Sequence, residues 1–178
     1  MRHEAEGQVR IRPFVLEDVP LKVEWINNPE NNQYLHYDIP LSLEKTCNWF
    51  RCKNDDVRRD CMIEYQGIPV GLIGLLAIDK VSVKAEFYIS MGETEYKRRG
   101  IATEATRLML DYAFTELQLN KVYLNVDAAN LGACALYEKV GFTCEGVFKE
   151  DLLHRGRLVD RKRYAMLKKE YINQIEIC

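Results

Sequence analysis

Three strand-like segments in the middle of the chain constrain its fold most. Residues 61–65, 70–78 and 84–90 are short runs in which apolar side chains predominate or alternate with polar ones. The four residues 66–69, with Gln66-Gly67 as the turn, separate the first two runs, and the short turn 79–82 leads into the third. Because such short connections join antiparallel neighbours, we expect the three segments to form one antiparallel unit of a sheet.

Helical and strand-like patterns alternate on either side of this unit. The remaining strands are predicted at 9–14, 121–126, 142–149 and 157–167, and the helices at 17–26, 42–53, 101–112 and 132–140. Ser42 is an N-cap residue and Gly141 a helix stop, while residues 31–41 are irregular. The order β-αα-βββ-α-β-α-ββ predicts an α/β fold with a mixed, mostly antiparallel sheet of six to seven strands and about four flanking helices.

The length of 178 residues suits one domain, which we place at 8–171, with terminal tails at 1–7 and 172–178. A net charge of -2 argues against bulk nucleic acid as a partner. No apolar run approaches the roughly 20 residues of a membrane span, and the polar N-terminus lacks the apolar core of a signal peptide. We therefore expect a cytoplasmic protein with no membrane or nucleic-acid partner.

The cysteines and histidines do not predict a metal site. The six cysteines include no CxxC pair, and the three histidines show no ligand spacing with them. We expect reduced cysteines that pack in the protein and no bound metal.

A basic, glycine-containing turn, Lys97-Arg98-Arg99-Gly100, precedes the amphipathic helix that starts at Ile101. The first backbone N–H groups of a helix have no partners within it and, with the positive end of the helix dipole, they attract anions. The three cations strengthen this field. A solvated basic turn is the alternative interpretation of the isolated pattern.

A second informative segment runs from Asn130 to Phe142. Its helical spacing places Ala133, Leu136 and Tyr137 on one face. Taken alone, Tyr137 would be a core aromatic residue and Asn130 an N-cap.

Together the two segments resemble the GCN5-related N-acetyltransferases, the GNAT family. In that family a (Q/R)xxGx(G/A) loop binds the pyrophosphate of acetyl-CoA, and an NxxAxxLYxKxGF segment contacts the pantetheine and the sulfur. Residues 97–102 match the first pattern, with Lys97 in place of Gln or Arg, and residues 130–142 match the second in full. The resemblance covers residues 11–171, and the pattern from Glu145 to Tyr164 is typical of the RimJ/RimL-like branch.

The resemblance implies a GNAT fold and transfer of an acetyl group from acetyl-CoA to a primary amine, by direct attack in a ternary complex. Tyr137 is implied as the acid for the CoA thiolate, since a phenol has a pKa near 10. Glu86 is our candidate for the base that deprotonates the amine. In the family the strand carrying Glu86 splays from its neighbour, which leaves backbone groups free to hold the thioester carbonyl. The implied cofactor-binding residues are Ile89, Ser90, Lys97, Arg98, Arg99, Gly100, Ile101, Ala102, Thr103, Asn130 and Lys139.

The acceptor amine is expected to bind against the N-terminal third, with Trp25, Tyr34 and Tyr37 as candidate contacts. The alternative is that these aromatics only pack helices onto the sheet. Segments around residues 24–30 and 39–44 resemble the amino-sugar acetyltransferases of the pseudaminic-acid pathway, whereas residues 85–87 and 123–127 resemble the spermidine acetyltransferases.

Acidic residues are scarce in the segment 31–40 of the N-terminal third, where Asp38 is the only one. We therefore expect a small neutral or anionic amine, such as an amino sugar, rather than a polyamine. Acetylation of a protein N-terminus, as in RimJ/RimL-like enzymes, and acetylation of spermidine remain alternatives. A module that senses acetyl-CoA without turnover is the non-enzymatic alternative. A homodimer is a further possibility for the oligomeric state.

Overall fold

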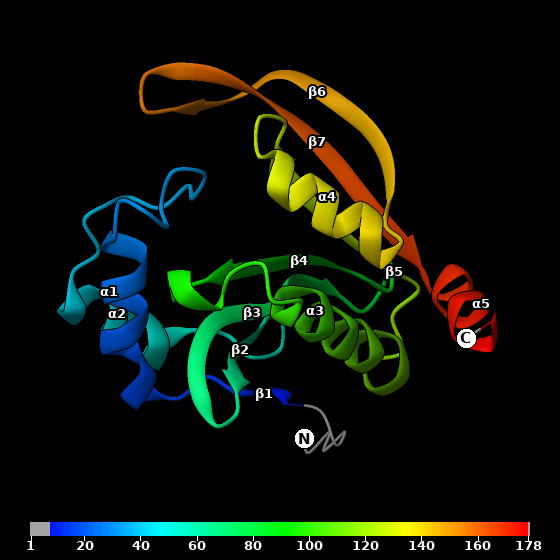
Figure 1. Cartoon of the computed structure of the whole chain (residues 1–178), viewed down its shortest axis with the longest axis horizontal. Coiled ribbons are helices and arrows are strands. Elements are labelled where there is room, and N and C mark those ends of the chain that lie inside the picture. Colours follow the sequence, from blue (N-terminus) through cyan, green and yellow to red (C-terminus); the bar gives the residue numbers. More distant parts are fainter. Residues whose placement is uncertain (1–7, 178) are drawn as a thin grey trace.

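The computed structural model describes residues 8–177 as one seven-stranded sheet with helices on both faces (Figure 1). The strand order in the sheet is β1-β2-β3-β4-β5-β7-β6. The strands are β1 (Val9–Pro13), β2 (Arg59–Tyr65), β3 (Ile68–Asp79), β4 (Lys84–Met91), β5 (Lys121–Asp127), β6 (Thr143–His154) and β7 (Arg157–Leu167). All neighbours pair antiparallel except β4 and β5, which are parallel. The predicted order and the mostly antiparallel sheet are confirmed, while the predicted N-terminal tail and Cys178 lie outside the described residues.

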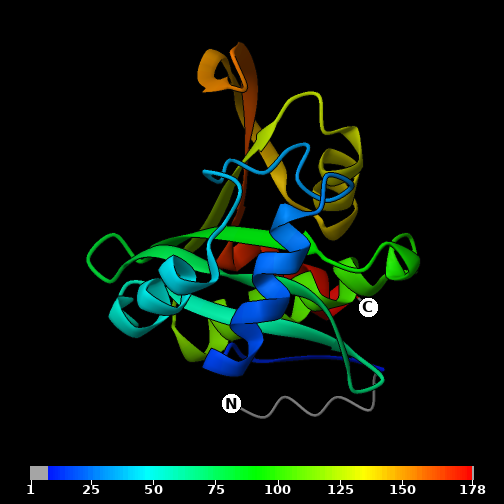
Figure 2. The same ribbon diagram turned by 90° about the vertical axis from the view of Figure 1, so that its left-hand side faces the viewer.

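Across residues 8–177, five α-helices accompany the sheet: α1 (Val19–Asn27), α2 (Leu43–Cys52), α3 (Ile101–Asp111), α4 (Leu131–Val140) and α5 (Lys168–Ile177). Figure 2 shows α1 and α2 on one side of the sheet, and the core residues divide accordingly. Met62 and Leu72 pack under α1 and α2, whereas their neighbours Ile63 and Ile73 face the α3 side. This alternation follows from the two-residue period of a strand.

The predicted helix boundaries rest on identifiable caps. Ser42 Oγ accepts the backbone N–H of Lys45 at 3.4 Å, and Asn130 Oδ1 accepts that of Ala133 at 3.1 Å. Gly141 ends α4 in the left-handed conformation, with φ of 107°.

Two C-terminal features differ from the sequence expectation. β6 extends to His154, beyond the predicted limit at 149, so that β6 and β7 form a long hairpin. α5 was not predicted, and it continues past residue 171 into the segment assigned to the C-terminal tail. Its anchor is a tertiary contact: the ring of Tyr171 lies 5.1 Å from that of Phe114, and its hydroxyl donates to Asp111 at 3.0 Å.

The parallel strands β4 and β5 separate shortly after they begin. Their pairing covers only residues 84–86 against residues 121–123, although β4 runs on to Met91 and β5 to Asp127. The expected splay is therefore confirmed, and it opens the sheet between the carboxyl-terminal halves of the two strands.

None of the helices within residues 8–177 has the length and apolar character that a membrane span needs.

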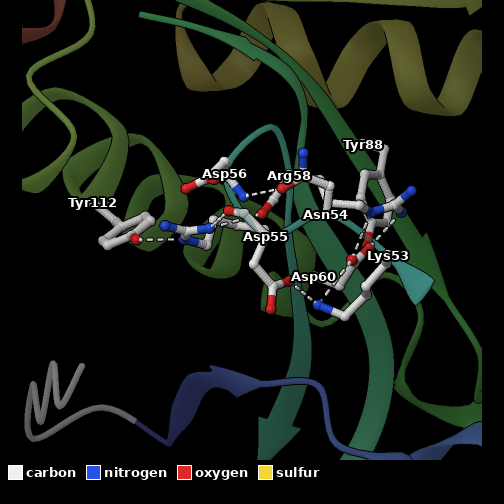
Figure 3. Close-up of polar contacts among 9 residues, drawn as sticks. Lys53, Asn54, Asp55, Asp56, Arg58, Asp60, Tyr88 and Tyr112 are labelled. Atoms are coloured by element: carbon white, nitrogen blue, oxygen red, sulfur yellow. Dashed lines mark hydrogen bonds and ion pairs between the residues drawn. The ribbon is translucent and has the colours of Figure 1, made fainter. Parts of the chain in front are cut away.

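A buried carboxylate joins the α1–α2 layer to the sheet. Asp60 on β2 accepts two hydrogen bonds from Arg58, at 2.7 and 2.8 Å, and one from the Tyr88 hydroxyl on β4, at 2.7 Å (Figure 3). The ammonium nitrogen of Lys53, just after α2, lies 3.9 Å from Asp60 Oδ2. Burial alone would raise the pKa of Asp60, but the hydrogen bonds from Arg58 and Tyr88, together with the charges of Arg58 and Lys22, outweigh it, so the pKa lies below 3.8.

We expect Asp60→Ala to lower the free energy of unfolding by about 3–5 kcal/mol, because it leaves partly buried cations and a buried hydroxyl without their shared partner. Urea denaturation at pH 7 measures this loss. In the wild type the contribution of Asp60 is present above pH 3.8 and disappears as the pH falls through its lowered pKa. Asp56→Ala, at an exposed position nearby, should change stability by about 0.5 kcal/mol or less. Equal losses in both variants would contradict a structural role for Asp60.

Candidate active site

A cavity of about 730 Å³ occupies the gap between the diverging strands β4 and β5. Residues 87–91 of β4 and 125–127 of β5 form its walls, and the first turn of α3 and one face of α4 close its sides. The loop after α1 covers it with Glu30, Asn31, Gln33, Tyr34, Leu35 and His36. A cavity of this size suits a small-molecule site.

The turn before α3 presents unused hydrogen-bond donors to this cavity. Gly100 is the N-cap of α3 and has a φ of 80°, which favours glycine. The backbone N–H of Glu104 donates to the Gly100 carbonyl at 3.0 Å, whereas no hydrogen bond within residues 8–177 uses the backbone N–H groups of residues 98–103. These free donors, the helix dipole and the neighbouring cations Lys97 and Arg98 together make a site suited to a diphosphate.

All the predicted cofactor-binding residues line this cavity except Arg99 and Ile101. Ile101 has only 1% of its surface exposed and packs in the core, so only its backbone N–H is available to a ligand. The guanidinium group of Arg99 lies over the ring of Tyr96, 5.3 Å from its centre. The ammonium group of Lys97 donates to Asn31 Oδ1 at 2.7 Å, which ties the turn to the loop after α1.

Tyr137 lies on α4, faces the cavity and is 6% exposed. Its ring packs against those of Phe87, Phe142 and Tyr164, with centres 6.3, 5.8 and 5.9 Å away. Burial raises the pKa of Tyr137 above its ordinary value, so the hydroxyl keeps its proton at neutral pH. No other residue within 8–177 forms a hydrogen bond with this hydroxyl, which leaves it available to a ligand.

Glu86 does not line the cavity, although the sequence suggested it as the base. It pairs with Tyr123 at the last position before β4 and β5 separate, so the strands are still joined there. Its Oε1 atom accepts a hydrogen bond of 3.0 Å from the side-chain amide of Asn125, which does line the cavity. The carboxylate of Glu86 therefore reaches the site through Asn125.

Of the three predicted acceptor contacts, only Tyr34 lines the cavity. Its hydroxyl donates to the backbone carbonyl of Ala129 at 3.3 Å, across to the segment after β5. Trp25 is 4% exposed and packs in the α1–α2 core, where its indole N–H donates to Glu93 at 2.7 Å. Tyr37 is partly exposed and lies beside Lys22, outside the cavity lining.

The sequence analysis missed several polar residues of the lining, among them Glu30, Asn31, Gln33, His36, Asn125 and Asp127. Asp127 is 6% exposed, and its Oδ1 atom accepts the backbone N–H of Ala129 at 2.9 Å, which fixes the turn after β5. Its place at the end of a strand and its membership of the segment 123–127, which resembles the spermidine acetyltransferases, were the available signals. Within residues 8–177 there is no group of three His, Cys, Asp or Glu side chains that could hold a metal ion.

Comparisons with known proteins agree with this geometry. The chain matches the acetyltransferase (GNAT) domain family over residues 8–143. It is 31% identical over 166 residues to the spermidine N(1)-acetyltransferase of Escherichia coli strain K12, covering 92% of this chain and 88% of the relative. It is 36% identical over 172 residues to the putative ribosomal N-acetyltransferase YdaF of Bacillus subtilis, covering 94% and 90%.

A solved structure shows the same arrangement of elements. The spermidine N-acetyltransferase of Vibrio cholerae, in complex with CoA and spermine, superposes with a TM-score of 0.86 at 30% identity, over 93% of this chain and 99% of that one. A family match across most of the chain, a shared fold and a cavity with free donors at a helix N-terminus lead to one conclusion. The chain belongs to the GNAT family and is an acetyl-CoA-dependent N-acetyltransferase.

Proposed function

We propose that the protein acetylates a primary amino group of a small polyamine of the spermidine type, by direct attack within a ternary complex with acetyl-CoA. The observation that carries this proposal is the pair of carboxylates in the cavity lining, Glu30 and Asp127. Neither forms an ion pair with a cationic side chain within residues 8–177. An unpaired carboxylate as buried as Asp127 is costly, and a polycationic substrate would supply the missing charge.

The names of the relatives support a polyamine over the amino sugar that the sequence suggested. Spermidine acetyltransferases of two bacterial species align with most of the chain, and none of the relatives described above is named for an amino sugar. The sequence argument counted acidic residues only in the segment 31–40. The fold adds Glu30 from just before this segment and Asp127 from the end of β5.

In this proposal the free N–H groups of residues 98–103 hold the diphosphate of acetyl-CoA, and Lys97, Arg98 and Lys139 add positive charge. Asn130 and the exposed edge of β4 at Ile89 and Ser90 hold the pantetheine and the thioester carbonyl. Hydrogen bonds to that carbonyl stabilise the negative charge that develops on its oxygen during attack.

Tyr137 donates its proton to the departing thiolate, a step for which its raised pKa keeps the proton in place. Glu86 acts as a positioning residue, because its carboxylate orients the amide of Asn125 in the cavity wall. The cytoplasmic location stays a prediction from the sequence.

Acetylation of a protein N-terminus is the second candidate function, and it is favoured by the similarity to the putative ribosomal acetyltransferase. An acceptor panel separates the two. With acetyl-CoA and thiol detection of released CoA, we expect kcat/KM for spermidine to exceed the values for a nucleotide-linked amino sugar, an aminoglycoside and N-terminal peptides by at least about tenfold, roughly one favourable charge contact. Preference for the peptides would overturn the polyamine assignment.

Asp127→Asn tests the charge argument within the panel. It should raise KM for spermidine by about tenfold because one attractive charge is lost. The KM for a monoamine with one cationic centre should rise less. An equal rise for both amines would mean that Asp127 only shapes the turn after β5.

Gly100→Asp should weaken binding of CoA by at least about tenfold, since it places a negative charge among the donors of the diphosphate site. Gly100→Asn is the matched control, because Asn has nearly the same shape, tolerates a positive φ and carries no charge. Calorimetric titration with CoA measures both. Similar affinities for the two variants would show that the diphosphate binds elsewhere.

Tyr137→Phe should lower kcat by about 100-fold or more while the affinity for acetyl-CoA stays the same, because only the proton donor is removed. Steady-state kinetics and calorimetry measure the two quantities. Unchanged turnover would remove Tyr137 from the mechanism.

A further inference from the structure

Side chains at the tip of the β6–β7 hairpin contact the loop that covers the cavity. The tip projects above this loop in Figures 1 and 2. The Nδ1 atoms of His36, in this loop, and His154, at the end of β6, lie 3.2 Å apart. His154 Nε2 lies 3.0 Å from the backbone carbonyl oxygen of Gln33. Beside this pair, Arg155 donates to the backbone and side-chain oxygens of Asn32 at 3.0 and 2.7 Å.

These contacts determine where the imidazole protons lie. A carbonyl oxygen only accepts hydrogen bonds, so Nε2 of His154 must carry a proton. With both rings neutral, Nδ1 of His154 is then an acceptor, and Nδ1 of His36 must donate to it. The lone pair of His36 is therefore on Nε2, and no residue within 8–177 forms a hydrogen bond with that atom.

We propose that His36 is a catalytic base that takes the proton from the acceptor ammonium group, and that His154 is the positioning residue that holds His36 in the required tautomer. This inference rests on the proposed function. His36 lines the same cavity as Tyr137 and Asp127, so an amine bound there has a proton acceptor on the side formed by the loop after α1. Glu86, the alternative base, is separated from the cavity by Asn125.

The surroundings of His36 keep it neutral at pH 7. Burial lowers the pKa of His36 below 6.5, and a proton on the ring of His154, on β6, would lower it further. Arg161 on β7 acts in the same direction, while Asp127 on β5 opposes them. A neutral imidazole is ready to accept a proton, and Asp127 then stabilises the imidazolium that forms.

The reaction balances with the groups present. The N–H bond of the ammonium breaks and its proton passes to Nε2 of His36. The free amine attacks the thioester carbon, forming the C–N bond as the C–S bond breaks, and Tyr137 protonates the thiolate. The excess proton of the new amide returns to the tyrosinate, and the proton on His36 leaves to solvent. The products are the acetylated amine, CoA and one proton.

The test is the pH dependence of kcat/KM for spermidine in the wild type and in His36→Asn. Asn keeps a donor near the position of Nδ1 but has no titrating base. In the wild type the acid limb should have its midpoint below 6.5, because only neutral His36 is active. In His36→Asn, kcat should fall by about 100-fold and this limb should vanish. Retention of both kcat and the limb would overturn the proposal.

Three further variants separate a base from a structural contact. His154→Gln should move the acid limb to higher pH, because Gln cannot take up a proton whose charge would lower the pKa of His36. Arg155→Ala removes the neighbouring contacts of the hairpin with Asn32 and should raise the acceptor KM while the limb stays. The pH profile of kcat/KM for Glu86→Gln should also retain the acid limb. Loss of the limb in Glu86→Gln, with retention in His36→Asn, would assign the base to Glu86.

A measurement independent of turnover keeps this inference distinct from the proposed function. Nitrogen–proton correlation NMR of the histidine rings in the whole protein should show His36 protonated at Nδ1 and His154 at Nε2 above pH 7. A His36 ring protonated at Nε2 would overturn the inference whatever the acceptor. Absence of acetylation of any amine, with the expected tautomers present, would overturn the proposed function and the assignment of His36 as its base.

Discussion

The separation of β4 and β5 is the constraint on which the site depends. Two parallel strands that stayed paired over their full length would fill the sheet with backbone hydrogen bonds and leave no room for a ligand. Here the pairing stops at Glu86 and Tyr123, and residues 87–91 of β4 and 125–127 of β5 line a cavity. The same gap brings the N-terminus of α3 and one face of α4 to a common space, because each helix follows one of the separating strands.

The sequence predicted well those features that depend on local chemistry. The basic turn and Gly100 lie where the pattern placed them, because a left-handed N-cap and free N–H groups follow from a few adjacent residues. Tyr137 was ambiguous as an isolated residue and became a site residue only through the full Asn130–Phe142 pattern. Three of the six strand pairings, β2–β3, β3–β4 and β6–β7, were predictable for a similar reason, since a short turn joins the two strands of each pair.

The acceptor side of the cavity could not be predicted because it is assembled by tertiary contacts. His36 and His154 are 118 residues apart in the chain, and nothing local relates them. Glu30 and Asp127 contribute charge to the cavity from two different elements, so a count of acidic residues in one segment underestimated its negative charge. α5 was missed because its position depends on the contacts of Tyr171 with Phe114 and Asp111 rather than on its own periodicity.

The two ends of the proposed reaction are held by different parts of the fold, and the loop after α1 connects them. Asn31 in this loop binds Lys97 beside the diphosphate site, and it also donates to the backbone carbonyl of Gly92 at 2.7 Å. A few residues further on, the loop meets the β6–β7 hairpin through His36 and Asn32. A shift of the loop would therefore alter the cofactor turn and the proton acceptor together. If acetyl-CoA binds at this turn and His36 is the base, as proposed, the loop would link the two substrates without a direct contact between them.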